Sequence, residues 1–124
     1  LVEVLFAQSV ADKTNWRLML AGPAAEMDLR QEAARLLDTH RAALADLRLQ
    51  FGEGSQETLP EAAVTRIDYP VLEYPAKPQS LNLDKTPVVE GRLTGIKGQY
   101  LIFGNAVLNV RNFTSYHVRL TALA

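Results

Sequence analysis

The stretch TPVVEGRLTGIKGQYLIFGNAVLNVRNFTSYHVRL, residues 86–120, decides the fold because apolar and polar residues alternate along it and glycines interrupt the alternation. A period of two places successive side chains on opposite faces of a strand. Glycines at alternate positions let a strand coil sharply, as strands do at the corners of small barrels. The pattern predicts a small curled antiparallel β-sheet or a partly open barrel.

Parity along these strands divides the predicted sheet into two faces. Residues 95–98 are expected to turn the chain, Gly104-Asn105 to form a two-residue hairpin, and residues 116–120 to form the last strand. The side chains expected on the buried face are Leu93, Leu108 and Val118. Those expected on the opposite, solvent-facing side are Arg92, Asn109 and Arg119.

The N-terminal half has helical periodicity instead. Its first apolar pattern fits a helix that residues 12–15 could interrupt and that the Gly-Pro pair at 22–23 stops. A second helix is expected over residues 29–51, with Asp28 as its N-cap and Gly52 as its C-terminal stop. The fold class predicted is therefore α+β, with two N-terminal helices followed by the sheet.

A connector separates these halves. It begins with a polar, glycine-containing loop and continues into YPVLEYPAKP, where each proline keeps the preceding tyrosine out of the α region. An extended connector or sheet-edge segment follows from that. We expect a helical segment at residues 1–52, the connector at 53–79 and a β-sheet module at 80–124, with the helices and the sheet forming one structural unit.

Composition narrows the function classes. The 124 residues have a net charge of -1 and contain no cysteine, which excludes a disulfide framework and any Cys-ligated metal. No apolar run reaches the roughly 20 residues of a membrane span, and the first stretch lacks the features of a signal peptide. We expect a cytoplasmic protein without a membrane segment, a cofactor or a metal.

Charge is unevenly distributed along the chain. Residues 1–76 carry seven Lys/Arg and twelve Asp/Glu, a balance of -5, whereas residues 77–124 carry six and two, a balance of +4. A basic sheet face is the electrostatic footprint of a weak nucleic-acid surface, although an ordinary solvated polar face is the alternative. The predicted binding residues for RNA or DNA are Arg92, Lys97, Arg111 and Arg119, with Tyr100 and Tyr116 as stacking candidates.

Other chemistry-bearing residues have structural interpretations. His40 lies on the apolar stripe of the second helix, where we expect a hydrogen-bonded, partly buried histidine. His117 has no acidic or histidine partner nearby in sequence. A dense cluster could be a binding loop, or a helix interruption in which Asp12 caps the segment that carries Trp16 into the core; its members are Asp12, Lys13, Thr14, Asn15, Trp16 and Arg17.

Two strings carry a family resemblance: VADKTNWRLML at residues 10–20 and NLDKTPVVEGRLTGIKGQYLIFGNAVLNVR at residues 82–111. Both resemble an uncharacterised prokaryotic family catalogued as a domain of unknown function. The resemblance implies that longer members carry a cysteine-rich, zinc-binding segment and a GIY-YIG-like nuclease segment upstream. Glu3 is the residue that would match the metal-binding glutamate of such nucleases. One carboxylate cannot assemble a hydrolytic site alone, so we expect no nuclease activity from this chain.

Two functions remain. The first is a non-catalytic binding module of a nucleic-acid-associated protein that uses the basic face of the sheet. The alternative is a structural or protein-interaction domain, which packs its helices onto an upstream region or dimerises through the apolar residues of the first helix, Leu1, Val4 and Leu5.

Overall fold

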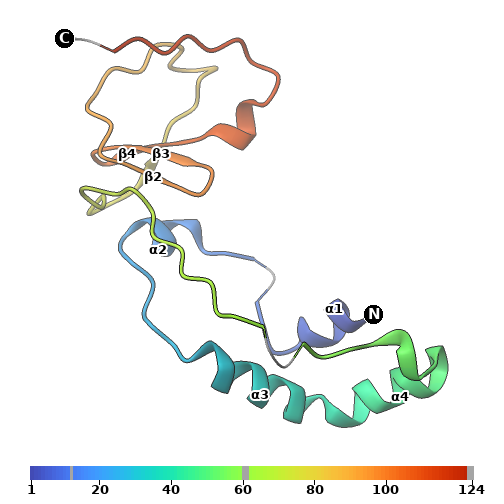
Figure 1. The fold of residues 1–124 in the computed structure, drawn as a ribbon. Helices are drawn as coiled ribbons and strands as arrows, with labels where there is room; N and C mark the ends of the chain where they lie inside the picture. The colour runs from blue at the N-terminus through green and yellow to red at the C-terminus, as the bar shows by residue number, and fades with distance from the viewer. Residues whose placement is uncertain (12, 60–61, 123–124) are drawn as a thin grey trace. The chain divides into compact units, whose positions relative to one another are not determined.

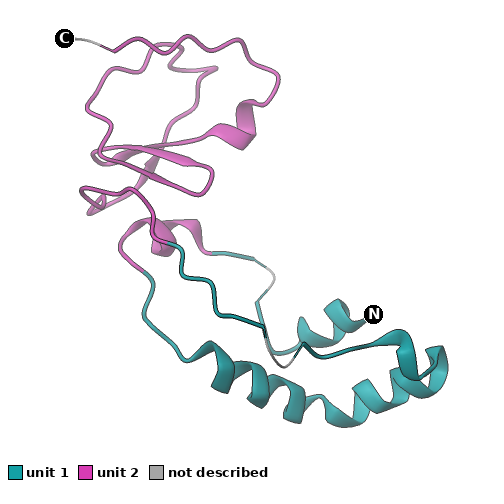
Figure 2. Cartoon of the chain, in the orientation of Figure 1, with its two compact units in different colours: residues 1–14, 24–67 teal, residues 15–23, 68–124 magenta. Residues whose placement is uncertain are grey.

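The computed structural model describes residues 1–11, 13–59 and 62–122 (Figure 1). It has the α+β fold predicted from the sequence, with a four-stranded sheet that is not closed. The chain divides into two compact units, shown in Figure 2: a helical unit, residues 1–14 and 24–67, and a sheet unit, residues 15–23 and 68–124. Within the described residues, no helix has the length and apolarity that a membrane crossing requires.

The second helical region begins and ends where the sequence predicts, whereas the first predicted helix ends already at Phe6, before the expected break at residues 12–15. Asp28 is the N-cap of α3, since its Oδ1 accepts hydrogen bonds of 3.0 Å from the backbone N–H groups of Arg30 and Gln31. Gly52 ends α4 with a φ of 94°, a conformation that favours glycine. The elements are α1 (Val2–Phe6), α3 (Leu29–Thr39), α4 (Arg41–Phe51) and η1 (Glu53–Ser55).

The single helix expected over residues 29–51 is interrupted at His40. Its backbone has φ -102° and ψ 13°, outside the helical region, although Leu44 N–H still donates to the His40 carbonyl. The imidazole is buried, lies edge-on to the Phe6 ring at 5.5 Å, and has its Nε2 2.8 Å from Ser9 Oγ. The expectation of a hydrogen-bonded, partly buried histidine is therefore confirmed.

The sheet unit contains the strands, in the order β1-β4-β3-β2. The hairpin expected at Gly104-Asn105 is confirmed, because Phe103 pairs with Ala106 across it. The other turn lies at Gly98-Gln99 rather than across residues 95–98, and β1 runs parallel to β4, so the sheet is mixed rather than purely antiparallel. The elements are α2 (Trp16–Leu20), β1 (Gln79–Ser80), β2 (Gly95–Lys97), β3 (Tyr100–Phe103), β4 (Ala106–Asn109) and η2 (Val110–Phe113).

The proline-containing segment adds an edge to this sheet, as predicted. Val71 forms an antiparallel bridge with Gly95. Two further backbone bonds hold the segment to β2, from Leu72 N–H to the Thr94 carbonyl at 2.8 Å and from Ile96 N–H to the Pro70 carbonyl at 2.9 Å. Residues 70–72 thus supply edge pairing for β2.

The core of the sheet unit lies on one face of the sheet. Ile102 pairs with Val107 and both are fully buried, together with Leu20 of α2. The set expected on one buried face was wrong: Leu108 is buried on the opposite face, and Leu93 and Val118 are exposed. The reason is that β2 begins only at Gly95 and residues 116–120 form no strand, so the assumed alternation does not extend across those segments.

The helical unit has no comparable core. Among its described residues, His40 is the only one that is buried. Large apolar side chains that are exposed instead include Leu1, Val4, Val10, Met27, Leu29, Leu49, Phe51, Leu59, Val64 and Ile67. The sheet unit also exposes ten large apolar side chains among its described residues, so the two units differ in what they bury and not in what they expose.

Candidate functional site

The three arginines of the predicted basic face are all exposed. They do not lie on adjacent strands: Arg92 precedes β2, Arg111 lies in η2, and Arg119 lies in the irregular C-terminal segment. No ion pair involves their guanidinium groups within the described part of the chain. Each guanidinium group is therefore accessible to an anion. Because none of the three arginines lies in a strand, strand pairing does not place them side by side.

Lys97 was expected to be an exposed basic residue, but it is buried. Its side chain is 5% exposed, and its ammonium donates hydrogen bonds to the carbonyls of Met19 at 2.8 Å and Gly22 at 2.9 Å. The rings of Tyr74 and Tyr69 lie 5.0 and 5.8 Å from the same nitrogen, within cation–π range. Lys97 therefore links residues 19–22 to β2 through hydrogen bonds, and its ammonium group is not available to a ligand from solvent.

The two stacking candidates are also engaged within the chain. Tyr100 is buried and stacks on Trp16, with ring centroids 6.0 Å apart and planes 15° apart. Tyr116 is exposed but donates a hydrogen bond from its hydroxyl to Asp84, and this bond raises the pKa of Tyr116 above its ordinary value. The ring of Tyr100 is therefore occupied by Trp16, whereas the ring of Tyr116 remains exposed to solvent.

Within the cluster at residues 12–17, Asn15, Trp16 and Arg17 make contacts inside the sheet unit. Asn15 caps α2 by accepting from Leu18 N–H at 3.2 Å, and Trp16 packs against the core of the sheet unit. Arg17 covers the Trp16 ring, with its guanidinium carbon 4.3 Å from the ring centroid. Lys13 and Thr14 are exposed, and the capping role expected of Asp12 lies outside the described residues.

The described residues contain no cluster of side chains that could bind a metal ion. Glu3 is exposed in the first turn of α1, and no group of three or more His, Asp or Glu side chains that could hold a metal occurs in the described ranges. His117 is likewise exposed in an irregular segment.

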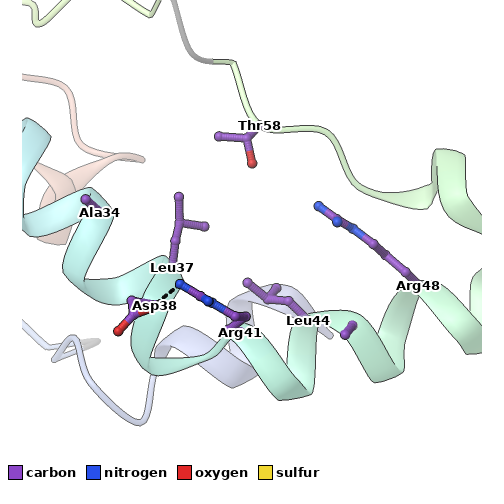
Figure 3. A pocket seen from close by; sticks show the side chains of 8 residues that line it. Ala34, Leu37, Asp38, Arg41, Leu44, Arg48 and Thr58 are labelled. Carbon is purple, nitrogen blue, oxygen red and sulfur yellow. Dashed lines mark hydrogen bonds and ion pairs between the residues drawn. The ribbon is translucent and has the colours of Figure 1, made fainter.

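The helical unit contains a groove that the sequence reasoning missed. Two adjoining hollows of about 320 and 350 Å³ lie between the α3–α4 pair and residues 55–58. We call them together the α3–α4 groove; the residues that line both are Leu37, Leu44, Arg48 and Thr58. Figure 3 shows the Arg48 side chain extending from α4 toward Thr58, with Leu37 and Leu44 beside it.

A signal for this groove is present in the sequence. Leu37, Arg41, Leu44 and Arg48 follow one another at steps of four, three and four residues, which places them on one helical face. Arginines on an apolar stripe combine a packing surface with donors for an anion. The break at His40 leaves that repeat in place across α3 and α4.

Comparison with known proteins gives one family. A family model described as "Protein of unknown function (DUF2797)" matches residues 1–118. No curated protein and no solved structure matches the chain.

Proposed function

The chain belongs to the DUF2797 family, and from its structure we propose that it is a protein-interaction module whose helical unit docks onto an apolar polypeptide surface. One observation carries the proposal: among its described residues the helical unit buries only His40, so its large apolar side chains stay exposed or only partly buried. Apolar residues that are not buried in the unit itself are expected to be covered by a partner, because removing them from water is favourable.

The sheet unit, unlike the helical unit, has a core of its own. It buries Leu20, Ile102 and Val107 and satisfies the Lys97 ammonium with main-chain carbonyls. A unit with its own core needs no partner to fold, so docking is assigned to the helical unit.

Association in solution tests this proposal. We expect the average mass in sedimentation equilibrium to rise with protein concentration, because a second copy can cover the exposed apolar side chains of the helical unit when no other partner is present. Leu49→Glu, at an α4 position that is 80% exposed, should abolish the rise. Leu72→Glu is the matched control, since Leu72 is 81% exposed but lies in the sheet unit. A chain that stays monomeric at every concentration would count against the proposal.

A second candidate function is weak nucleic-acid binding by the sheet unit. The observation that favours it is the exposure of Arg92, Arg111 and Arg119 without acidic partners in the described residues. Phosphate contacts of this kind give dissociation constants of about 10⁻⁴ to 10⁻⁶ M. Sequence preference should be small, because Tyr100 is stacked within the chain and cannot read bases.

Titration of single-stranded and duplex RNA and DNA at low salt tests this second function. The double variant Arg92→Glu/Arg111→Glu should lose most of the binding, and each lost phosphate contact should lower the salt slope by about one unit. Arg30→Glu/Arg35→Glu, in the helical unit, is the control with the same change of charge. Equal affinity of both double variants for nucleic acid, or no binding by the wild type, would contradict nucleic-acid binding by the sheet unit.

A further inference from the structure

Residues 15–23, which we call the α2 segment, belong to the sheet unit but lie between two stretches of the helical unit in the chain (Figure 2). No backbone–backbone hydrogen bond joins this segment to the rest of the described chain. Its main-chain bonds are internal, such as those from Met19 N–H to the Asn15 carbonyl and from Ala21 N–H to the Leu18 carbonyl. Side chains therefore hold the segment on the sheet unit, as they hold a bound peptide.

Two apolar side chains anchor the α2 segment. Leu20 is fully buried in one cluster with Ile102 and Val107. Trp16, one helical turn earlier, stacks on the Tyr100 ring with the ring centroids 6.0 Å apart. Residues four apart lie on one face of a helix, so both anchors reach the same apolar surface of the sheet unit.

The C-terminal end of α2 is bound through its carbonyl groups. In a continuing helix the Met19 carbonyl would accept from the backbone N–H of residue 23, but Pro23 has no N–H. The Lys97 ammonium donates to that carbonyl at 2.8 Å and to the Gly22 carbonyl at 2.9 Å. A positive charge is also electrostatically favourable at a helix C-terminus. Lys97 thus recognises a helix that ends at a Gly-Pro pair.

The helix of the α2 segment depends on this surface. With five residues, α2 is far shorter than the roughly 12–15 residues at which an isolated helix becomes marginally stable in water. Asn15 caps its N-terminus by accepting from Leu18 N–H, and Lys97 binds the carbonyls at its other end. A segment that needs its docking surface in order to be helical resembles a ligand that folds on binding.

We propose that the sheet unit contains a binding site for a short helical polypeptide, and that the α2 segment of the same chain occupies it. The site takes an aromatic residue, a leucine four positions later and a proline three positions after that, which are supplied by Trp16, Leu20 and Pro23. Lys97 is the specificity-determining residue, because a helix that continues satisfies its own carbonyls. The site lies in the sheet unit and is independent of docking by the helical unit.

Binding of the segment in trans to the full chain tests the proposal. The vacated chain carries Trp16→Ala and Leu20→Ala, which remove both anchors. The probe is a dye-labelled peptide with the sequence of residues 15–23, and its twin carries Leu20→Glu. Fluorescence anisotropy measures the affinity of each peptide for the vacated chain and for the wild type.

We expect the peptide to bind the vacated chain. The wild type should bind it at least about tenfold more weakly, because its own segment competes at the high effective concentration of a tethered ligand. The twin should bind the vacated chain at least about tenfold more weakly than the peptide, because a carboxylate replaces the buried leucine.

Lys97→Met in the vacated chain should weaken peptide binding about tenfold or more, since two charge-assisted hydrogen bonds are lost. Lys85→Met, at an exposed lysine of the sheet unit, is the matched control and should leave the affinity unchanged.

Each of four results would overturn the proposal: no binding to the vacated chain, equal binding to the vacated and wild-type chains, equal binding of the two peptides, or equal effects of the two lysine variants. If the two alanine changes unfold the sheet unit, the bound peptide should restore the protection of β3 amides against hydrogen exchange. A vacated chain that the peptide neither binds nor refolds would contradict the site in that case too.

Discussion

Ile102→Ala should destabilise the sheet unit by about 2–5 kcal/mol, the range for truncating a fully buried Ile to Ala. Ile102 has no exposed surface, pairs with Val107 and lies in the cluster that contains Leu20 and Tyr100. Its removal leaves a cavity at the centre of that cluster. Chemical denaturation followed by the fluorescence of Trp16, which packs on the same cluster, measures the loss.

The matched control is Ile96→Ala, on the neighbouring strand β2. Ile96 is 40% exposed, so the same truncation should cost clearly less. Similar losses at the two positions would mean that the core does not lie where the structure places it.

Gly95→Ala should cost about 1–3 kcal/mol, because it overpacks the contact between β2 and the edge segment. A Cβ atom at Gly95 would lie 2.9 Å from Val71 Cγ1 and 3.1 Å from Val71 Cα, and the second of these is backbone. The change should also loosen the edge pairing at the Val71–Gly95 bridge. Thermal unfolding and amide exchange at Leu72 measure both effects.

Gly91→Ala is the control for this prediction. A Cβ there meets Phe103 Cβ at 3.6 Å, an ordinary van der Waals contact, so stability should change little. Val71→Ala in the Gly95→Ala background removes the Cγ atoms and should recover part of the loss, giving a measurable coupling between the two sites. A neutral Gly95→Ala would contradict the close approach of the two segments.

The sequence predicted the features that depend on local chemistry. Asp28 and Gly52 bound the helical region, and Gly104-Asn105 makes the hairpin, because caps and tight turns are determined by a few neighbouring residues. The strands assumed around Arg92 and Leu93 and over residues 116–120 do not form. Alternation there does not reflect a strand, since tertiary contacts decide which alternating segments pair.

Tertiary contacts also limited what the sequence could predict about the candidate sites. Arg92, Arg111 and Arg119 are exposed as predicted, although the strand parity used to predict it does not hold. The burial of Lys97 was not predicted, because its partners are carbonyls of residues 19 and 22, far away in sequence. The groove around Arg48 was missed for a similar reason. Its opposite wall comes from the loop after α4, and no periodicity predicts where such a loop lies.

Native-state amide hydrogen exchange of the isolated chain tests most directly whether the helical unit lacks a core of its own. Few buried apolar contacts give a low free energy of local opening. We expect amides of α3 and α4 to be at least about a hundredfold less protected than those of β3 and β4, corresponding to a difference of about 2.7 kcal/mol in opening free energy. Equal protection of helices and strands would contradict the assignment of the helical unit as the part that a partner completes.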